Sequence, residues 1–277
     1  MKKTALVTSC GFGVRAREVC EQLFTHGYEV VAVNEKQYEP ENMVAKITFE
    51  QADFNSKESI DQLVERLKAY QFSAVVNCHD ALAFVGDNLR HDFCDFDYLD
   101  FAKVLNYNVV SIAAICIGLK DNIEKGGCIV NITSSAAKEG GFVTIAYNAS
   151  KAAVENMSKS LANNFGLYNE IRVNCVAPGW IPKSSGVAAV GTRALADSMT
   201  PVTPNGQNKD LAKAVIDVIN NASINGSTVV VDGGISSSYL PYMLESLLEK
   251  GDETVDISMN TLIELIRKEN LKNSKKK

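Results

Sequence analysis

The sequence predicts an α/β fold: a doubly wound parallel sheet with helices on both faces, followed by an extra helical segment at the C-terminus. Short apolar runs rich in β-branched residues recur along residues 3–235, and segments with helical periodicity separate them. Strands that alternate with helices in this way form parallel sheets joined by right-handed crossovers. The binding crevice of such a sheet lies at the carboxyl ends of its strands.

The elements follow one another in a regular order. The predicted strands are residues 5–8, 29–33, 45–49, 74–77, 128–132, 172–176 and 227–231. Helical patterns over 15–25, 59–69 and 210–220 lie between them. After Gly234 the alternation stops, and residues 239–250 and 257–271 are predicted as two more helices. We therefore expect one domain over residues 1–238 and a C-terminal helical extension over 239–277.

Composition limits the partners and the compartment. A net charge of -5, from 28 basic and 33 acidic residues, gives no general attraction to nucleic acid or to an anionic membrane. The seven cysteines are odd in number and contain no C-x-x-C pair, and the three histidines lack metal-ligand spacing. With no signal peptide or long apolar span in sight, we expect buried thiols, no metal, and a cytoplasmic location.

Tyr147 and Lys151 stand four residues apart in a segment with good helix formers, so a helix would place them on one face. A cation beside a phenol lowers the phenol pKa from its usual value near ~10, which would let Tyr147 exchange a proton close to neutrality. Ser134 ends the preceding strand-like run, thirteen residues before Tyr147. These groups could protonate a carbonyl or deprotonate an alcohol.

In these residues the chain resembles the short-chain dehydrogenase/reductase family, which implies a Rossmann-like sheet. Ser134, Tyr147 and Lys151 match the family's catalytic triad, and Asn108 falls where a fourth member is expected, with Asn106 as a rival. The resemblance implies that Lys151 lowers the Tyr147 pKa and binds ribose hydroxyls. It also implies that Ser134 orients the substrate oxygen and that Asn108 holds a water linking Lys151 to solvent.

A glycine-containing turn between the first strand and the first helix is the predicted phosphate site. Glycines allow a close backbone approach, and a helix amino terminus offers free N–H groups to a pyrophosphate. Compared with the family, a serine replaces the first glycine and the turn is about two residues shorter. The predicted contacts are Thr8, Ser9, Gly11, Phe12 and Gly13.

Asn34 and Glu35 end the second strand, where the family contacts the adenosine ribose. A carboxylate there favours ribose hydroxyls and repels a 2′-phosphate, which predicts NAD as the cofactor. NADP stays possible because three basic residues are near: Arg15, Arg17 and Lys36. Asp53 matches the adenine position, with a turn aspartate before a helix as the alternative.

Two further segments complete the expected cofactor site. Asn77 keeps the first residue of the family's Asn-Asn-Ala-Gly segment, whereas Asp80 puts a charge where glycine usually lies. Pro178, Gly179 and Ile181 keep the family's Pro-Gly turn but lack the threonine that often follows it. These departures bear on cofactor positioning, while the proton-transfer residues stay as in the family.

The expected function is that of an NAD(P)-dependent oxidoreductase that interconverts a small-molecule carbonyl and an alcohol. A nonredox epimerase or dehydratase, or a cofactor-sensing protein with little catalysis, are the alternatives. The resemblance also predicts a homo-dimer or homo-tetramer paired through the helix after Asn108 and the helix carrying Tyr147. The first helix carries an apolar band, and its burial within the domain is the other explanation: Val109, Ile112, Ala113, Cys116 and Ile117.

Overall fold

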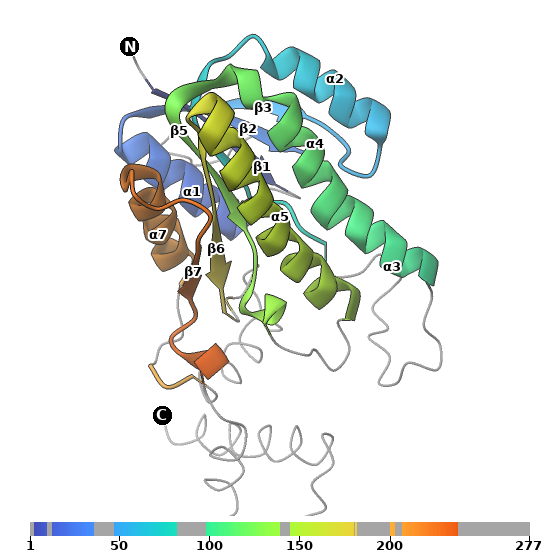
Figure 1. Ribbon diagram of the computed structural model, residues 1–277, viewed down its shortest axis with the longest axis vertical. Helices are drawn as coiled ribbons and strands as arrows, with labels where there is room; N and C mark the ends of the chain where they lie inside the picture. The colour runs from blue at the N-terminus through green and yellow to red at the C-terminus, as the bar shows by residue number, and fades with distance from the viewer. Residues whose placement is uncertain are drawn as a thin grey trace, which may run out of the picture.

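The computed structural model describes residues 3–9, 13–35, 47–81, 98–138, 145–179, 181, 200–202 and 207–237. In this part of the chain seven parallel strands form one sheet in the order β3-β2-β1-β4-β5-β6-β7 (Figure 1). The strands are β1 Lys3–Ser9, β2 Tyr28–Asn34, β3 Ile47–Gln51, β4 Phe72–Asn77, β5 Ile123–Ile132, β6 Arg172–Pro178 and β7 Thr228–Val231. The predicted parallel sheet is confirmed, and the predicted extension over 239–277 lies outside the described residues.

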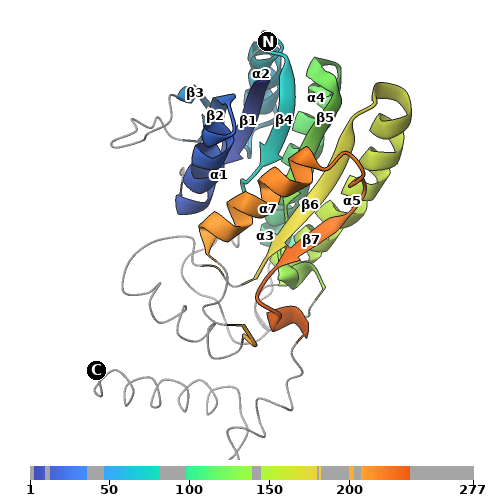
Figure 2. The same cartoon turned by 90° about the vertical axis from the view of Figure 1, so that its left-hand side faces the viewer.

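Helices cover both faces of this sheet. They are α1 Val14–Thr25, α2 Lys57–Leu67, α3 Tyr98–Leu105, α4 Ser111–Gly118, α5 Ile145–Asn169 and α7 Asn208–Asn220, with the π-helical turn η1 Asn106–Val110 and the 3-10 turns η2 Lys120–Asn122, η3 Ser135–Ala137 and η4 Ile235–Ser237. Figure 2 shows α1 and α7 side by side on one face, and α4 and α5 lie on the other. The chain thus has two cores, one on each face.

The strand residues alternate between these two cores. In β1, Ala5 and Val7 pack under α1 and α7, whereas Leu6 packs on the opposite side with α2 and α4. All three are fully buried. Successive side chains of a strand point to opposite faces, so a central strand covered on both sides must be apolar throughout. This explains why the sequence shows continuous apolar runs.

The predicted boundaries differ most where polar residues sit inside an element. β5 begins at Ile123, five residues before the predicted start. The prediction missed this first part of the strand because it is polar and contains Gly126, whose φ is 81°. The third strand lies two residues later than predicted, at Ile47–Gln51, and is a partly exposed edge strand. The helix predicted to open at Tyr147 already begins at Ile145.

The strand order reverses between β1 and β4. These two strands are neighbours in the sheet, with Thr8 paired to Asn77 near their carboxyl ends. The chain leaves β1 toward β2 on one side and returns to β4 on the other. In doubly wound sheets such a switch point opens the ligand crevice. The predicted functional residues should therefore meet at this edge.

One continuous helix, Tyr98–Gly118, is formed by α3, η1 and α4. Of the described helices it alone is long and apolar enough to cross a membrane by length and composition, and 39% of its most apolar window is buried. A core helix of a folded domain meets the same criteria. Here Asn108 and Ser111 lie in its middle and bond to other elements of the domain. The absence of a membrane partner stays a prediction.

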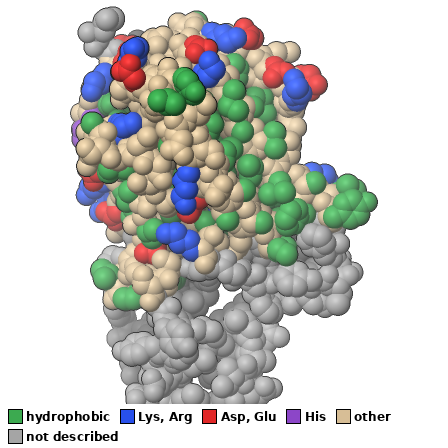
Figure 3. All heavy atoms as spheres, in the orientation of Figure 1, with side chains coloured by type: hydrophobic (Ala, Val, Ile, Leu, Met, Phe, Trp, Pro, Cys, Tyr) green, Lys and Arg blue, Asp and Glu red, His purple; other side chains and the backbone are tan. Residues whose placement is uncertain are grey.

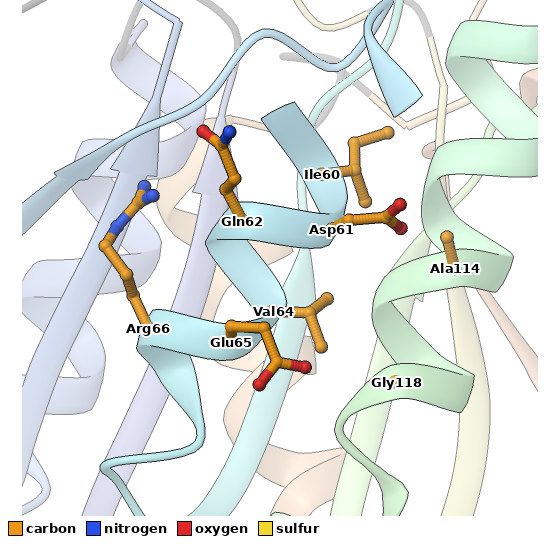
Figure 4. Close-up of a pocket in the computed structure, with 8 residues that line it drawn as sticks. All are labelled: Ile60, Asp61, Gln62, Val64, Glu65, Arg66, Ala114 and Gly118. Carbon is orange, nitrogen blue, oxygen red and sulfur yellow. The ribbon is translucent and has the colours of Figure 1, made fainter. Parts of the chain in front are cut away.

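A shallow groove of about 670 Å³ runs between α2 and α4 (Figure 4). The small residues Ala114 and Gly118 on α4 form one wall, and Val64 of α2 packs against Gly118. Asp61 and Glu65 line its outer side. None of the predicted site residues contributes to this groove.

Candidate active site

A chain of buried polar side chains links the ends of β1, β4 and β5. Thr8 Oγ1 lies 3.3 Å from Asn77 Oδ1, and Asn77 Nδ2 donates to Asn131 Oδ1 at 2.8 Å. Asn131 in turn donates to Ser158 of α5 at 2.9 Å. Thr8 and Asn77 are fully buried. Their side chains therefore belong to the buried network that links the strands, and their contact with a cofactor stays a prediction.

His79 extends this chain toward the helix layer. Its Nδ1 lies 2.6 Å from Thr8 Oγ1 and its Nε2 lies 2.7 Å from Ser111 Oγ. Because the Ser111 hydroxyl donates to Tyr107 O, the neutral tautomer that fits both contacts donates from Nε2 to Ser111 Oγ and accepts at Nδ1 from Thr8. In that tautomer the single Thr8 proton goes to His79 and not to Asn77 Oδ1. The ring stacks on Phe54 with centroids 4.0 Å apart. Burial lowers the pKa of His79 to about 3, so the ring stays uncharged.

Tyr147 and Lys151 meet at the carboxylate of Asp80, which follows β4. The Tyr147 hydroxyl donates to Asp80 Oδ2 at 3.0 Å, and Lys151 Nζ lies 3.3 Å from the same oxygen. Lys151 also donates to Ile132 O at 3.0 Å and is fully buried. Its ammonium stands 5.5 Å from the centroid of the Tyr147 ring, as the helical spacing predicted. Arg15 Nη1 of α1 lies 3.8 Å from Asp80 Oδ2.

This arrangement changes the expected ionisation of Tyr147. Burial raises the pKa of Tyr147, and the negative charge of Asp80 raises it further. The Arg15 guanidinium and a hydrogen bond with Ser134 act in the opposite direction. The expectation that Lys151 brings this pKa toward neutrality is therefore wrong for this arrangement. The main reason is burial of the phenol, and the Asp80 carboxylate that accepts its hydrogen bond adds to the effect.

Ser134 completes the predicted triad. It lies at the end of β5, where it precedes η3, and its Oγ accepts a hydrogen bond from Ala136 N at 3.2 Å. Its hydroxyl also hydrogen-bonds Tyr147. The fold thus brings Ser134, Tyr147 and Lys151 together, although Ser134 comes from a strand end and the other two come from α5.

Asn108 supports the site from η1. Its Oδ1 accepts from Ala81 N at 2.7 Å, and its Nδ2 donates to Ala81 O at 2.8 Å and to Ser150 Oγ at 2.9 Å. Asn106 is exposed whereas Asn108 is fully buried, which favours Asn108 as the site residue. The Asn108 amide holds Ala81, the residue after Asp80. The water link from Asn108 to Lys151 stays a prediction. A π-turn is a frequent feature of functional sites, and here it turns Asn108 inward.

The predicted phosphate turn is described only in part, since Gly11 and Phe12 lie outside the described residues. Gly13 is the N-cap of α1, with extended φ/ψ of -68° and 174° and no side-chain cap bond. Arg15, the second residue of the helix, is buried and its Nε has no hydrogen-bond partner. Ser9 is buried at the end of β1. A helix amino end together with a buried cation suits a phosphate group.

The residues predicted to contact adenosine lie at the ends of β2 and β3. Asn34 is buried, and Glu35 is partly exposed, with its carbonyl accepting from Gln51 Nε2 at 3.0 Å. Asp53 is exposed and its Oδ1 accepts from Asn55 N at 2.8 Å. That bond closes the turn before α2, which was the alternative interpretation of Asp53. Contacts of these residues with a nucleotide stay predictions.

The Pro-Gly turn follows β6. Gly179 N donates to Val231 O at 3.1 Å, and Ile181 is buried in the core under α7. A Cβ on Gly179 would lie 2.7 Å from Asp232 Cβ, so packing against Asp232 explains this glycine. Pro178 is the last residue of the strand. This segment therefore has a packing role that is independent of a cofactor.

Arg15, His79 and Asp80 belong to the site, although sequence analysis did not predict the roles they have here. It predicted no role for His79, and it predicted that Asp80 lies beside a bound cofactor and that Arg15 could contact NADP. It did not indicate that the two are 3.8 Å apart or that Asp80 binds Tyr147. Two opposite charges at positions expected to be buried were the available signal, because buried charges require partners.

Comparisons with known proteins agree with this geometry. The family model described as enoyl-(acyl carrier protein) reductase matches residues 13–236. The chain is 28% identical over 247 residues to 2-dehydro-3-deoxy-D-gluconate 5-dehydrogenase of Dickeya dadantii, covering 84% of this chain and 94% of that protein. It is 26% identical to acetoacetyl-CoA reductase of an Acinetobacter species, with 84% and 98% covered.

A solved structure of a short chain dehydrogenase family protein from Francisella tularensis has the same fold, with a TM-score of 0.72. It is 24% identical and covers 86% of this chain and 100% of its own. The family match spans most of the chain, and the Ser-Tyr-Lys group sits at the switch point of the sheet. The chain belongs to the short-chain dehydrogenase/reductase family of NAD(P)-using oxidoreductases.

Proposed function

We propose that this protein interconverts a small-molecule carbonyl and an alcohol with a nicotinamide dinucleotide, using Tyr147 as the proton-transfer residue. The observation that carries this proposal is the meeting of three side chains at the crevice: Ser134, Tyr147 and Lys151. A phenol held by a hydroxyl and an ammonium, at the carboxyl ends of parallel strands, suits proton exchange with a substrate oxygen. Relatives that are named as reductases and dehydrogenases support the same reaction type.

The chain's own residues divide the work as follows. Tyr147 Oη gives a proton to the substrate oxygen in reduction and takes it back in oxidation. Ser134 can donate to and accept from that oxygen, so it fixes the orientation of the substrate. Lys151 holds its ammonium against the Tyr147 ring and offers N–H donors to ribose hydroxyls. The cofactor, when bound, supplies or accepts the hydride.

NAD is the proposed cofactor, because Glu35 directly follows β2 and its carboxylate would repel a 2′-phosphate. Arg15 keeps NADP as the alternative, since a buried guanidinium close to the amino end of α1 could also attract a phosphate. Residues at this end of the site therefore fit a dinucleotide phosphate. Next to Arg15, the Asp80 carboxylate is bonded to Tyr147 and Lys151.

We also infer a homo-oligomer and a cytoplasmic location. Apolar side chains gather on the face formed by α3, α4 and α5 (Figure 3), and the most exposed of them belong to these helices: Tyr98, Leu99, Val110, Ile117, Leu167 and Tyr168. An exposed apolar face of this kind is typical of an interface. The described cysteines are free and buried, which suits a reducing compartment: Cys20, Cys78, Cys116, Cys128 and Cys175.

Replacing Tyr147 by Phe tests the catalytic assignment. The variant keeps the ring and loses the proton donor, so turnover should fall by ~10²–10⁴ while cofactor affinity changes little. Activity is measured over a panel of carbonyls and alcohols, and affinity by calorimetry with NAD, NADH, NADP and NADPH. Tyr70→Phe, on the α2–β4 connection, is the matched control. Retained turnover in Tyr147→Phe would remove Tyr147 from the mechanism.

A cofactor-binding protein without turnover is the second candidate, favoured by the bonds that Asp80 makes to Tyr147 and Lys151. Saturable binding of a dinucleotide with no turnover of any substrate in the panel would support it. Lys151→Ala separates the two cases further, since it should weaken both binding and turnover if Lys151 reaches the ribose. An unchanged affinity in that variant would mean that Lys151 does not contact the cofactor.

A further inference from the structure

The charges of the site converge on one oxygen, Asp80 Oδ2. It accepts the Tyr147 hydroxyl at 3.0 Å and lies 3.3 Å from Lys151 Nζ and 3.8 Å from Arg15 Nη1. The Asp80 side chain is 3% exposed. Hydrogen bonds to a buried carboxylate are among the strong ones, because one partner is charged and water is excluded. Asp80 therefore binds the Tyr147 hydroxyl and the Lys151 ammonium, which a ligand in this crevice would need as its own partners.

The main chain on both sides of Asp80 is fixed. The amide of Asn108 clamps Ala81 by bonds of 2.7 Å and 2.8 Å. His79, on the other side, is held at both ring nitrogens, at 2.6 Å and 2.7 Å. The carboxylate is thus placed by a segment that is anchored in the buried polar network, and it belongs to the built structure of the site.

Arg15 adds a buried cation with unused bonding capacity. The residue is 8% exposed, its Nε has no hydrogen-bond partner, and its Nη1 lies beyond hydrogen-bond distance of Asp80. A buried guanidinium that lacks close partners favours an incoming anionic group. Such a group at the amino end of α1 would draw Arg15 away from Asp80. The contacts of Asp80 with Tyr147 and Lys151 would then be weaker.

We propose that Asp80 is a positioning residue that stands in for a ligand: without one, its carboxylate holds Tyr147 Oη and Lys151 Nζ. A bound dinucleotide must displace it before Tyr147 can exchange a proton with a substrate. The first statement concerns the protein alone, and the second rests on the proposed function. Displacement would couple cofactor binding to the release of the proton-transfer group.

The protonation of Tyr147 reports on this contact. Among the described residues, the charged groups close to the phenol are Arg15 of α1, Asp80 after β4 and Lys151 of α5. His79, next to Asp80, is the other titratable group of this buried network. His79 is neutral because burial lowers its pKa to about 3. Without the Asp80 charge, two cations and no anion of this group would face the phenol, and the phenolate would form at lower pH.

Carbon-13 labelling of the tyrosine Cζ atoms gives a direct test on the full-length protein without any ligand. The Tyr147 resonance is assigned by its loss in Tyr147→Phe. In Asp80→Asn the midpoint of its titration should fall by at least ~1 pH unit relative to wild type, a tenfold rise in the ionisation constant. Asp61→Asn, which removes the same charge from the exposed face of α2, should match wild type.

Two results would overturn the proposal: equal midpoints in wild type and Asp80→Asn, or, where Tyr147 stays neutral in both over the whole pH range in which the protein is folded, an equal Cζ chemical shift in the two proteins. If Asp80→Asn does not fold, the double variant Arg15→Gln/Asp80→Asn removes both charges of the ion pair together. The midpoint should still fall in it, because Asp80 bonds to the phenol directly and its charge acts on the phenol more strongly than that of Arg15.

Calorimetry with NADH and NADPH tests the displacement. Asp80→Asn should bind the preferred dinucleotide at least ~10-fold more tightly than wild type, and Asp61→Asn should bind like wild type. Equal affinity in wild type and Asp80→Asn overturns the displacement. If the Tyr147 resonance shifts as expected while no variant binds either dinucleotide, the proposed function fails and the role of Asp80 in holding Tyr147 stands.

Discussion

At the scale of single residues, the function depends on where charges are placed in a buried crevice. Lys151, Arg15 and Asp80 all lie within reach of Tyr147, and each changes the cost of moving its proton. In a medium of low polarity these interactions are strong. Single substitutions that change a charge should therefore have large and specific effects.

Glu35 is expected to set the choice of dinucleotide. Glu35→Ser removes a negative charge from the end of β2, so it should raise the preference for NADP relative to NAD. The measurement is the ratio of the two affinities, compared with Glu29→Ser, an exposed glutamate at the other end of the same strand. A ratio that stays fixed or falls would show that Glu35 does not face the ribose.

His79 should make stability depend on pH. Burial lowers the pKa of His79 to about 3 in the folded protein, whereas the pKa in the unfolded chain is near 6.5. Between these two pH values the unfolded chain binds a proton at His79 and the folded protein does not. Stability contributed by the neutral ring is fully present above pH ~6.5 and falls by about 1.4 kcal/mol per pH unit as the pH decreases toward 3.

Urea unfolding at several pH values between 4 and 7.5 checks this expectation. His79→Gln should lose stability less steeply on acidification than wild type, by about one proton. His26→Gln, at the exposed end of α1, should follow the wild-type curve. Parallel curves for His79→Gln and wild type would contradict a neutral buried ring.

At the scale of elements, helix ends are fixed by side chains from distant strands. Arg172 of β6 donates to four main-chain oxygens after and within the last turn of α7, at 2.6–3.0 Å. The last carbonyls of a helix have no partner within it and carry a partial negative charge. The Arg172 guanidinium binds these carbonyls and so joins the end of α7 to the start of β6.

Arg172→Leu should therefore lower the free energy of unfolding by about 2 kcal/mol, because charged hydrogen bonds are lost and carbonyl groups are left unsatisfied. Lys125→Leu is the control: Lys125 pairs with Glu170 at 2.7 Å, but both side chains are mostly exposed. Such a surface pair contributes about 1 kcal/mol or less. Equal losses in the two variants would show that Arg172 does not cap α7.

At the scale of the whole molecule, the apolar band predicted along the first interface helix was partly wrong. Ile112 and Cys116 are fully buried in the protein's own core, because α4 packs on the sheet on one side. Ile117 and the neighbouring Val110 remain exposed, at 53% and 54%. The helix is thus apolar on two sides, and only its outer side is free for a partner subunit.

Light scattering on the full chain should show a dimer or tetramer. Val110→Glu/Ile117→Glu should dissociate it, because two charges would be buried in an apolar contact. Phe24→Glu, an exposed apolar residue on the opposite face of the sheet, is the control. A wild-type monomer defeats the proposal, and an unchanged oligomer in the double variant moves the interface elsewhere.

A truncation after Ser238 separates the role of the C-terminal segment. If the segment contributes to the interface, the truncated protein should have a smaller mass or a lower stability than the full chain. A dimer of unchanged stability in both forms would show that residues 239–277 take no part in it. The helix predicted over 257–271 would be only marginally stable alone in water.

The sequence by itself indicated the parallel sheet and the succession of strands and helices along the chain, through apolar runs for strands covered on both faces. The four-residue spacing of Tyr147 and Lys151 on a helix, together with the resemblance to a family, indicated the group of Ser134, Tyr147 and Lys151. The tertiary structure decided the electrostatics. Asp80 lies 67 residues before Tyr147 in the sequence, yet accepts a hydrogen bond from its hydroxyl, and Asn108, within a π-turn, bonds to Ala81. Such contacts depend on how separate elements pack, and the ionisation of a buried group depends on all its neighbours at once.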